Sequence, residues 1–217
     1  DECDGFKETA DEIAGVETGT VRIGTFSSTA THWLPSIVKS FRAEHPGLDY
    51  ELLLGDYSEI EGWLEDGRVD LGFVRLPARK TLATEFIARD ELVAVMPRNH
   101  PLACAERFPI AAFADEPFMA LEHGIDSEVA DLFGSNGVDV HATFTTWEDH
   151  AIMAMVEAGL GLGILPSLSM HRCAYDIASA PLPGLRRAVS SNACAPPPTP
   201  GFPATCRVDS PRAPVQP

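Results

Sequence analysis

A cluster of hydroxyl side chains near the start of the chain offers the clearest chemistry in the sequence. The cluster follows an expected strand, Val21–Phe26, and it consists of Ser27, Ser28, Thr29 and Thr31. Hydroxyls and free backbone N–H groups at the start of a helix form a site for a carboxylate or another anion. Capping a helix needs one Ser or Thr, so four hydroxyls favour ligand contact, with plain capping as the alternative.

Three later loops occupy the same topological position, after a strand and before a helix. Asp56 follows the second expected strand. Glu122 and Ser127 bound a glycine-containing loop, and Thr145 and Thr146 end a further strand. In open α/β sheets, ligands bind beyond the carboxyl ends of the strands. Each loop is therefore a candidate for ligand contact, although Asp56 serves equally well as a helix cap.

Catalysis and metal binding lack the residue patterns that they need. No nucleophile is accompanied by a partner base, and the seven histidines show no i,i+4 pair. The five cysteines are scattered without a Cys-x-x-Cys pair, which argues against zinc and against a disulfide framework. The run 159–163, Gly-Leu-Gly-Leu-Gly, lacks the helix start and the downstream acid of a nucleotide loop, and it predicts a helix end leading into a packed strand. We expect a binding protein, not an enzyme, with no catalytic residue, metal or cofactor.

Charge and hydropathy limit the partners further. Sixteen basic side chains stand against thirty-two acidic ones, which gives a formal net charge of −16. Such a surface repels nucleic-acid phosphates, so this chain is not expected to bind DNA by itself. No apolar stretch reaches the roughly 20 residues of a membrane span, and no basic-then-apolar leader opens the sequence. We therefore expect no membrane contact and a cytoplasmic location.

Apolar periodicity predicts strands alternating with helices. A helix over 34–41 precedes a strand at Tyr50–Leu54, and a second helix precedes a continuous apolar strand at Val69–Val74. This alternation is typical of βαβ units and a parallel sheet. Two strands, Leu82–Ala88 and Glu91–Met96, then lead into a second α/β unit. The sequence therefore predicts two lobes.

Changes in composition mark the expected boundaries. They divide the chain into a linker or helix remnant at 1–19, the first part of subdomain I at 20–88, subdomain II at 89–166, a return to subdomain I at 167–185, and an irregular proline-rich tail at 186–217. Closely spaced prolines exclude a helix interior or a central strand in that tail.

Five ordered segments resemble the effector-binding region of LysR-type transcriptional regulators. They are, in chain order, Val21–Gly24, Leu34–Pro35 with Phe41 and His45–Gly47, Leu64–Gly72, Val93–Leu102 and Met155–Pro166. The resemblance implies an α/β fold with two Rossmann-like subdomains of the type 2 periplasmic-binding-protein kind. It also implies a small-molecule cleft between them and a hinge made by chain crossings near 75–88 and 165–182.

The same resemblance implies a function and a set of contacts. By position, the cleft would be lined by Ser27, Ser28, Thr29, Asp56, Arg75, Glu122, Thr145 and Thr146. The chain would be a regulatory domain that senses a small anionic metabolite, with a transporter's solute-binding protein as the alternative. Its partners would be the effector and a second copy in a homodimer, or a homotetramer for the full-length protein. DNA would be bound only through an N-terminal winged helix-turn-helix outside this sequence.

Overall fold

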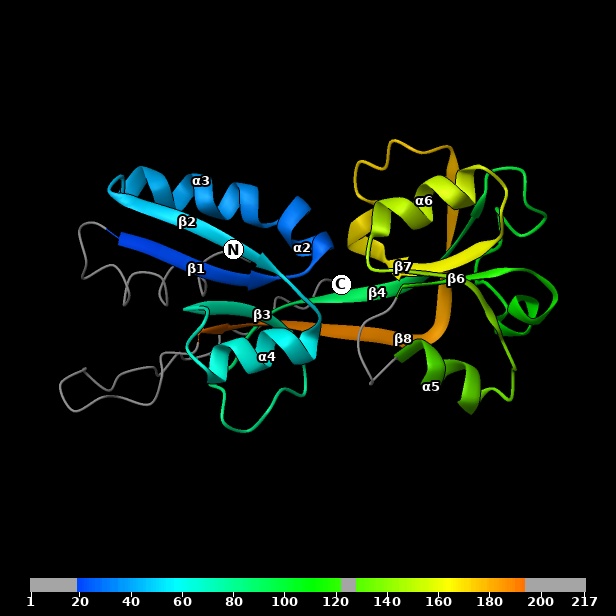
Figure 1. Cartoon of the computed structure of the whole chain (residues 1–217). Coiled ribbons are helices and arrows are strands. Elements are labelled where there is room, and N and C mark those ends of the chain that lie inside the picture. The colour runs from blue at the N-terminus through cyan, green and yellow to red at the C-terminus, as the bar shows by residue number, and fades with distance from the viewer. Residues whose placement is uncertain (1–18, 122–127, 194–217) are drawn as a thin grey trace, which may run out of the picture.

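Two lobes lie side by side in the computed structural model, which describes residues 19–121 and 128–193 (Figure 1). In the first lobe, strands alternate with helices. Its elements are β1 (Gly19–Thr25), α2 (Ser27–His32), α3 (Leu34–Glu44), β2 (Leu48–Leu54), α4 (Tyr57–Glu65) and β3 (Leu71–Arg75). β1 pairs in parallel with both β2 and β3. The expected parallel sheet of βαβ units is therefore confirmed in this lobe.

Apolar side chains at helical spacing hold α3 and α4 against this sheet. Ile37 and Phe41 of α3 are buried, as are Ile60 and Leu64 of α4. α4 approaches β3 so closely that a Cβ at Gly72 would lie 2.8 Å from the Ile60 side chain. The packing of these two helices therefore positions the carboxyl ends of β1 and β3.

The second lobe repeats the arrangement. Its elements are a 3₁₀ helix η1 (Ile110–Asp115), β5 (Phe118–Leu121), α5 (Glu128–Ser135), β6 (Ala142–Thr146), α6 (Asp149–Glu157), β7 (Leu162–Pro166) and a 3₁₀ helix η2 (Ser167–Met170). β5 pairs in parallel with β6 and with β7. α5 and α6 cover opposite faces, because their buried side chains belong to two separate apolar clusters (Figure 1).

Two long antiparallel strands, β4 (Glu85–Pro97) and β8 (Ile177–Ala193), join the lobes. They complete one sheet with the order β2-β1-β3-β8-β4-β7-β5-β6. The expected pair of strands at 82–88 and 91–96 is wrong, because β4 is continuous. Its charged middle is accommodated by shifts in register between Phe86 and Ala88 and between Glu91 and Val93.

The course of β8 corrects the expected tail. Residues 186–193 were expected to be irregular, whereas β8 continues to Ala193 and pairs with both β3 and β4. The return crossing also comes later than the expected 165–182, since residues 186–188 pair with the middle of β4. β8 occupies the position between β3 and β4, where it pairs with the backbone groups of both strands. The pattern of side chains in the sequence did not reveal this position. The expectations for 1–18 and 194–217 lie outside the described residues.

The glycine-rich run adopts the expected helix end and packed strand. Gly159 follows α6 with a φ of 74°, as a helix C-terminus commonly requires. A Cβ on Gly161 would lie 2.2 Å from the Pro117 carbonyl oxygen, so only glycine fits there. The glycines of 159–163 therefore serve helix termination and close packing. No described helix is long and apolar enough to cross a membrane.

Candidate functional site

The hydroxyl cluster lies at the start of α2, at the carboxyl end of β1. Ser28 is 3% exposed and Thr29 is fully buried, yet neither hydroxyl has a hydrogen-bond partner among the described residues. Ser27 is half-buried, and its carbonyl accepts a bond of 2.9 Å from the hydroxyl of Thr31. The N-cap of α2 is Phe26, and no side chain caps this helix. Plain capping therefore does not account for Ser28 and Thr29.

Two buried hydroxyls without partners are costly. Leaving a buried polar group unsatisfied costs roughly 1–3 kcal/mol, and such groups in a folded protein call for a specific reason. A ligand that hydrogen-bonds to Ser28 and Thr29 would supply the missing partners. Their burial at the end of β1 is the feature of this structure that most favours ligand binding.

Asp56 has a structural role in the described contacts. Its carboxylate accepts a 2.7 Å hydrogen bond from the Glu59 N–H, and the Glu59 carboxylate accepts a 3.0 Å bond from the Asp56 N–H. This reciprocal capping box satisfies two free N–H groups at the start of α4. The geometry therefore favours the capping alternative for Asp56.

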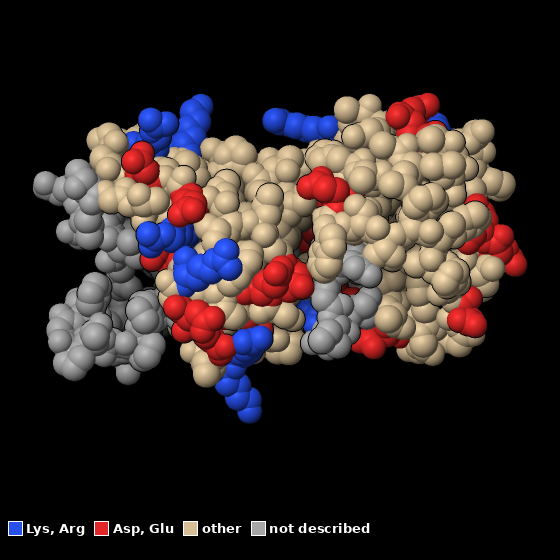
Figure 2. Space-filling view, in the orientation of Figure 1, with Lys and Arg blue, Asp and Glu red and all other residues tan. Residues whose placement is uncertain are grey.

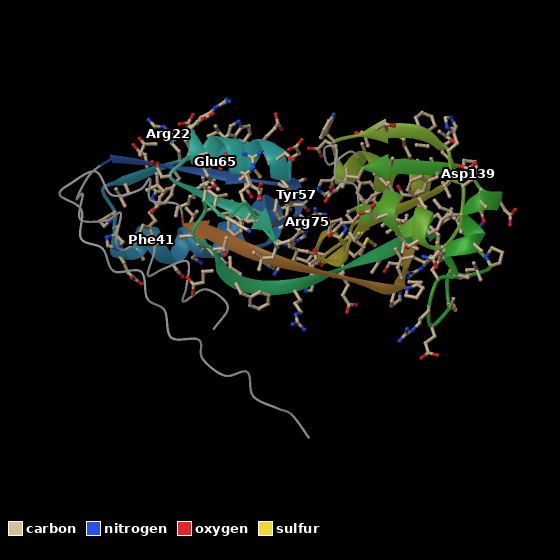
Figure 3. All side chains as sticks on the ribbon, turned by 90° about the horizontal axis from the view of Figure 1, so that it is seen from below. Arg22, Phe41, Tyr57, Glu65, Arg75 and Asp139 are labelled. Atoms are coloured by element: carbon tan, nitrogen blue, oxygen red, sulfur yellow. The ribbon has the colours of Figure 1, made fainter. Side chains whose placement is uncertain are left out.

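Aromatic contacts connect the hydroxyl cluster to Arg75. Phe26, directly before α2, packs edge-on against Tyr57 at the start of α4, with ring centroids 5.2 Å apart. The guanidinium of Arg75, at the end of β3, lies over the same Tyr57 ring at 5.8 Å (Figure 3). The carboxyl ends of β1 and β3 thus present two hydroxyls and one cation on the same side of the first lobe.

Arg75 also reaches the second lobe. Its guanidinium forms an ion pair of 3.2 Å with Glu128, the first residue of α5, and both side chains are about one quarter exposed. Burial raises the pKa of Glu128, an effect that the Arg75 charge opposes. Sequence reasoning missed Glu128, because an acid in the first turn of a helix is ordinary and its partner lies in the other lobe.

The remaining candidates are not brought into this arrangement by any described contact. Thr145 is exposed on β6, and the Thr146 hydroxyl accepts a 3.2 Å hydrogen bond from the Glu148 N–H. Glu122 and Ser127 lie outside the described residues. Their contact with a ligand stays a prediction.

Two buried carboxyls position η2 beside the first lobe. Asp90, in the middle of β4, accepts bonds from the Ser167 hydroxyl at 2.6 Å and from the Leu168 N–H at 3.2 Å. Asp149 accepts a hydrogen bond from the Ser169 hydroxyl. Burial raises the pKa of both carboxyls. Sequence reasoning missed these anchors, since each partner is distant along the chain.

A histidine pair bridges the lobes next to η2. His32 at the end of α2 faces His171 with ring centroids 6.4 Å apart. Burial lowers the pKa of His32, and the charges of His171, His150 and Arg172 lower it further. Among the described residues, the lobes are therefore connected by an ion pair and by an imidazole pair.

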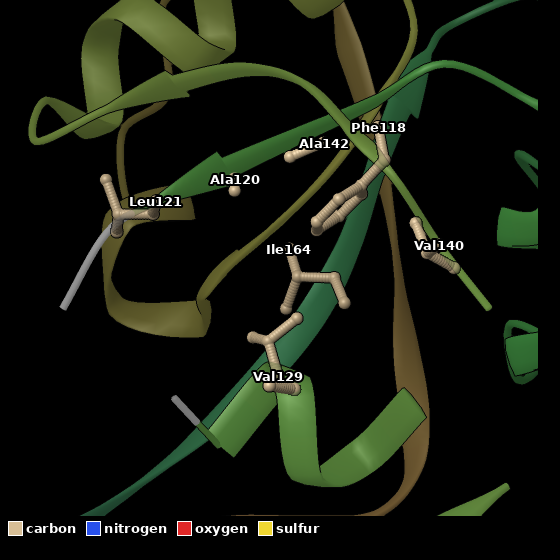
Figure 4. A pocket seen from close by; sticks show the side chains of 8 residues that line it. Phe118, Ala120, Leu121, Val129, Val140, Ala142 and Ile164 are labelled. Carbon is tan, nitrogen blue, oxygen red and sulfur yellow. The ribbon is translucent and has the colours of Figure 1, made fainter. Parts of the chain in front are cut away.

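An apolar pocket of about 140 Å³ lies within the second lobe, between α5 and the strands that it faces (Figure 4). Phe118, Leu121, Val129 and Ile164 are among its lining side chains, and none of its lining residues is charged. Ligand pockets commonly measure about 300–1,000 Å³ and contain a few polar groups. This pocket therefore suits an anionic metabolite less well than the residues around Arg75.

The surface charges do not form a basic patch on the face shown in Figure 2, where acidic and basic side chains are interspersed over the first lobe. On this lobe Arg79 forms ion pairs with Glu61 at 3.1 Å and with Glu65 at 2.5 Å. Among the described residues, no cluster of three or more His, Cys, Asp or Glu side chains has a metal-site arrangement.

Two α/β lobes joined by a pair of crossing strands, with polar side chains at strand ends, define a binding domain of the type 2 periplasmic-binding-protein kind. The chain belongs to the LysR substrate binding domain family, whose model matches residues 14–204.

Similar sequences and structures agree with this family. The chain is 30% identical over 156 residues to the uncharacterised HTH-type transcriptional regulator YvbU of Bacillus subtilis, covering 72% of this chain and 53% of that protein. It is 30% identical over 171 residues to the probable HTH-type transcriptional regulator LrrA of Synechococcus elongatus, covering 78% and 58%. The chain thus spans a little over half the length of these curated relatives.

Solved structures support the fold. The regulatory domain of Synechocystis PCC6803 CcmR, in complex with 2-PG, has a TM-score of 0.72 at 21% identity, covering 81% of this chain and 87% of that one. The effector binding domain of QuiR, in complex with shikimate, has a TM-score of 0.69 at 20% identity with the same coverage.

Proposed function

We propose that this chain is the effector-sensing domain of a LysR-type transcription regulator, which binds a small anionic metabolite between its two lobes. The observation that carries the proposal is the pair of buried hydroxyls of Ser28 and Thr29, which have no hydrogen-bond partner within the described residues. Phe26 and Tyr57 connect them to the cation of Arg75. Hydroxyls and a guanidinium are the donors that a carboxylate or phosphate prefers.

Several further features support a sensor rather than an enzyme. The similar sequences are those of transcriptional regulators, and two domains of the same fold were solved in complex with 2-PG and with shikimate. These relatives also favour a regulator over a transporter's solute-binding protein. Ser28 and Thr29 have no adjacent base among their described contacts, so the site is suited to holding a ligand without turnover.

The proposal extends to the partners and the location. A second copy of this domain and a DNA-binding segment of a longer protein would complete the regulator, which would act in the cytoplasm. With a net charge of −16, this domain would leave DNA contact to that other segment. Light scattering of the purified chain would report the dimer, and a gel shift by the chain alone would contradict the division of roles.

Native mass spectrometry tests the sensing function directly. We expect the gently ionised chain to carry a retained small molecule, or to acquire one from a metabolite extract, which denaturation releases. The Ser28→Ala, Thr29→Ala double variant should retain it less well, whereas Thr31→Val should not change retention. Equal retention by the double variant and the wild type would contradict the proposed site.

A further inference from the structure

We propose that the Glu128 carboxylate pairs with Arg75 and so joins the two lobes when no effector is bound. A carboxylate group of the effector then displaces Glu128 from Arg75. This inference rests on the proposed function, and it narrows the effector from an anionic metabolite to a carboxylic acid.

The first lobe positions Arg75 through its strand and through an aromatic contact. Arg75 is the last residue of β3, whose preceding residues Phe73 and Val74 are fully buried. Its guanidinium lies 5.8 Å from the centre of the Tyr57 ring, which is in turn packed against Phe26. A fixed, planar guanidinium matches the geometry of a carboxylate. Arg75 is thus prepared for a carboxylate at this position.

Glu128 supplies that carboxylate from the opposite lobe, but in unfavourable surroundings. It lies 3.2 Å from the guanidinium and is largely buried. Burial raises its pKa, the negative charges of Asp131 on α5 and Asp90 on β4 raise it further, and Arg75 lowers it. An ion pair that is opposed by desolvation and by two like charges contributes little net stability. A ligand carboxylate can therefore replace Glu128 at low cost.

Replacement has two consequences. A neutral ligand cannot replace Glu128, because Arg75 would lose its ion pair without gaining another. A carboxylate exchanges one ion pair for another and gains hydrogen bonds from the hydroxyls near α2. The inter-lobe contact that Glu128 made is then carried by the ligand, so binding and lobe arrangement are coupled through this one residue.

Acetate is the simplest probe of this exchange, and the side-chain Nε–H signal of Arg75 in NMR is the readout, assigned by its loss in Arg75→Gln. At pH 7 we expect acetate to shift this signal at about fivefold lower concentration in Glu128→Gln than in the wild type, since the internal competitor is gone. Glu128→Asp should behave more like the wild type. Asp131→Asn removes a charge from the same helix and should change the midpoint by less than about twofold.

A pH titration without acetate separates competition from a merely structural role. As the pH is lowered through the raised pKa of Glu128, the Arg75 signal should move in the wild type, and it should stay constant in Glu128→Gln. If acetate acts equally on the wild type and Glu128→Gln, or on neither, the inference is wrong. A domain that retains an anionic metabolite without a carboxylate group, such as a phosphate ester, but shows no acetate response would keep the proposed function and lose this inference. If the domain shows the expected acetate response but retains no metabolite, the inference about Glu128 stands and the proposed function fails.

Discussion

Replacing Thr29 with Val should stabilise the empty domain. Thr29 is fully buried, its hydroxyl has no partner in the part of the chain that the structure describes, and Val has nearly the same shape without the polar group. Removing an unsatisfied buried hydroxyl should recover about 1 kcal/mol of the roughly 1–3 kcal/mol that it costs. For a chain of this size, about 1 kcal/mol raises Tm by about 2–4 °C.

The matched control is Thr25→Val. Thr25 is also fully buried, but its hydroxyl donates to the Phe26 carbonyl at 3.3 Å. Loss of that bond should leave Tm unchanged or lower it. Thermal unfolding followed by circular dichroism measures both variants, and calorimetry should show that Thr29→Val weakens effector binding. A lower Tm for Thr29→Val than for Thr25→Val would refute the reasoning, because it would mean that the Thr29 hydroxyl already has a stabilising partner.

Three further outcomes are expected. Gly161→Ala should destabilise the domain by about 3 kcal/mol or more, since its Cβ would meet the Pro117 carbonyl. Gly159→Ala has open space around its Cβ but a φ of 74°, so it should cost about 1 kcal/mol. Urea unfolding measures the free energy of unfolding of both variants. Because burial raises the pKa of Asp149, the folded chain holds a proton that the unfolded chain releases, so this residue makes the free energy of unfolding fall as pH rises above about 4. Asp149→Asn should make the free energy of unfolding depend less steeply on pH, and an unchanged dependence would contradict this role of Asp149. Small-angle scattering should show a more compact particle with saturating effector, and an identical profile would argue against lobe closure.

The sequence predicted the local features of this fold. Helical spacing placed Ile37 and Phe41 on the buried face of α3, and the glycines around Gly161 predicted a helix end and a packed strand, as the structure has them. These features depend on neighbours along the chain. The length of β8 was underestimated, because its place between β3 and β4 is set by backbone pairing with residues 80 or more positions away.

The same distinction applies to the site. A run of hydroxyls after a strand pointed to Ser28 and Thr29, but only the structure places both in the interior, without partners among residues 19–121 and 128–193. The ion pair between Arg75 and Glu128 spans 53 positions and two lobes, and no local pattern marks Glu128. Contacts between the lobes are set by the tertiary structure. The sequence therefore pointed to Arg75 but not to its partner, Glu128.

The central claim is that a small molecule binds where α2, Tyr57 and Arg75 meet. The most direct test is two-dimensional NMR of the labelled chain with the metabolite identified by mass spectrometry. We predict that the largest amide shifts fall on Ser28, Thr29 and Arg75, and that the Arg75 side-chain signal moves with them. Shifts confined to the apolar pocket around Phe118, with Arg75 unchanged, would contradict the account.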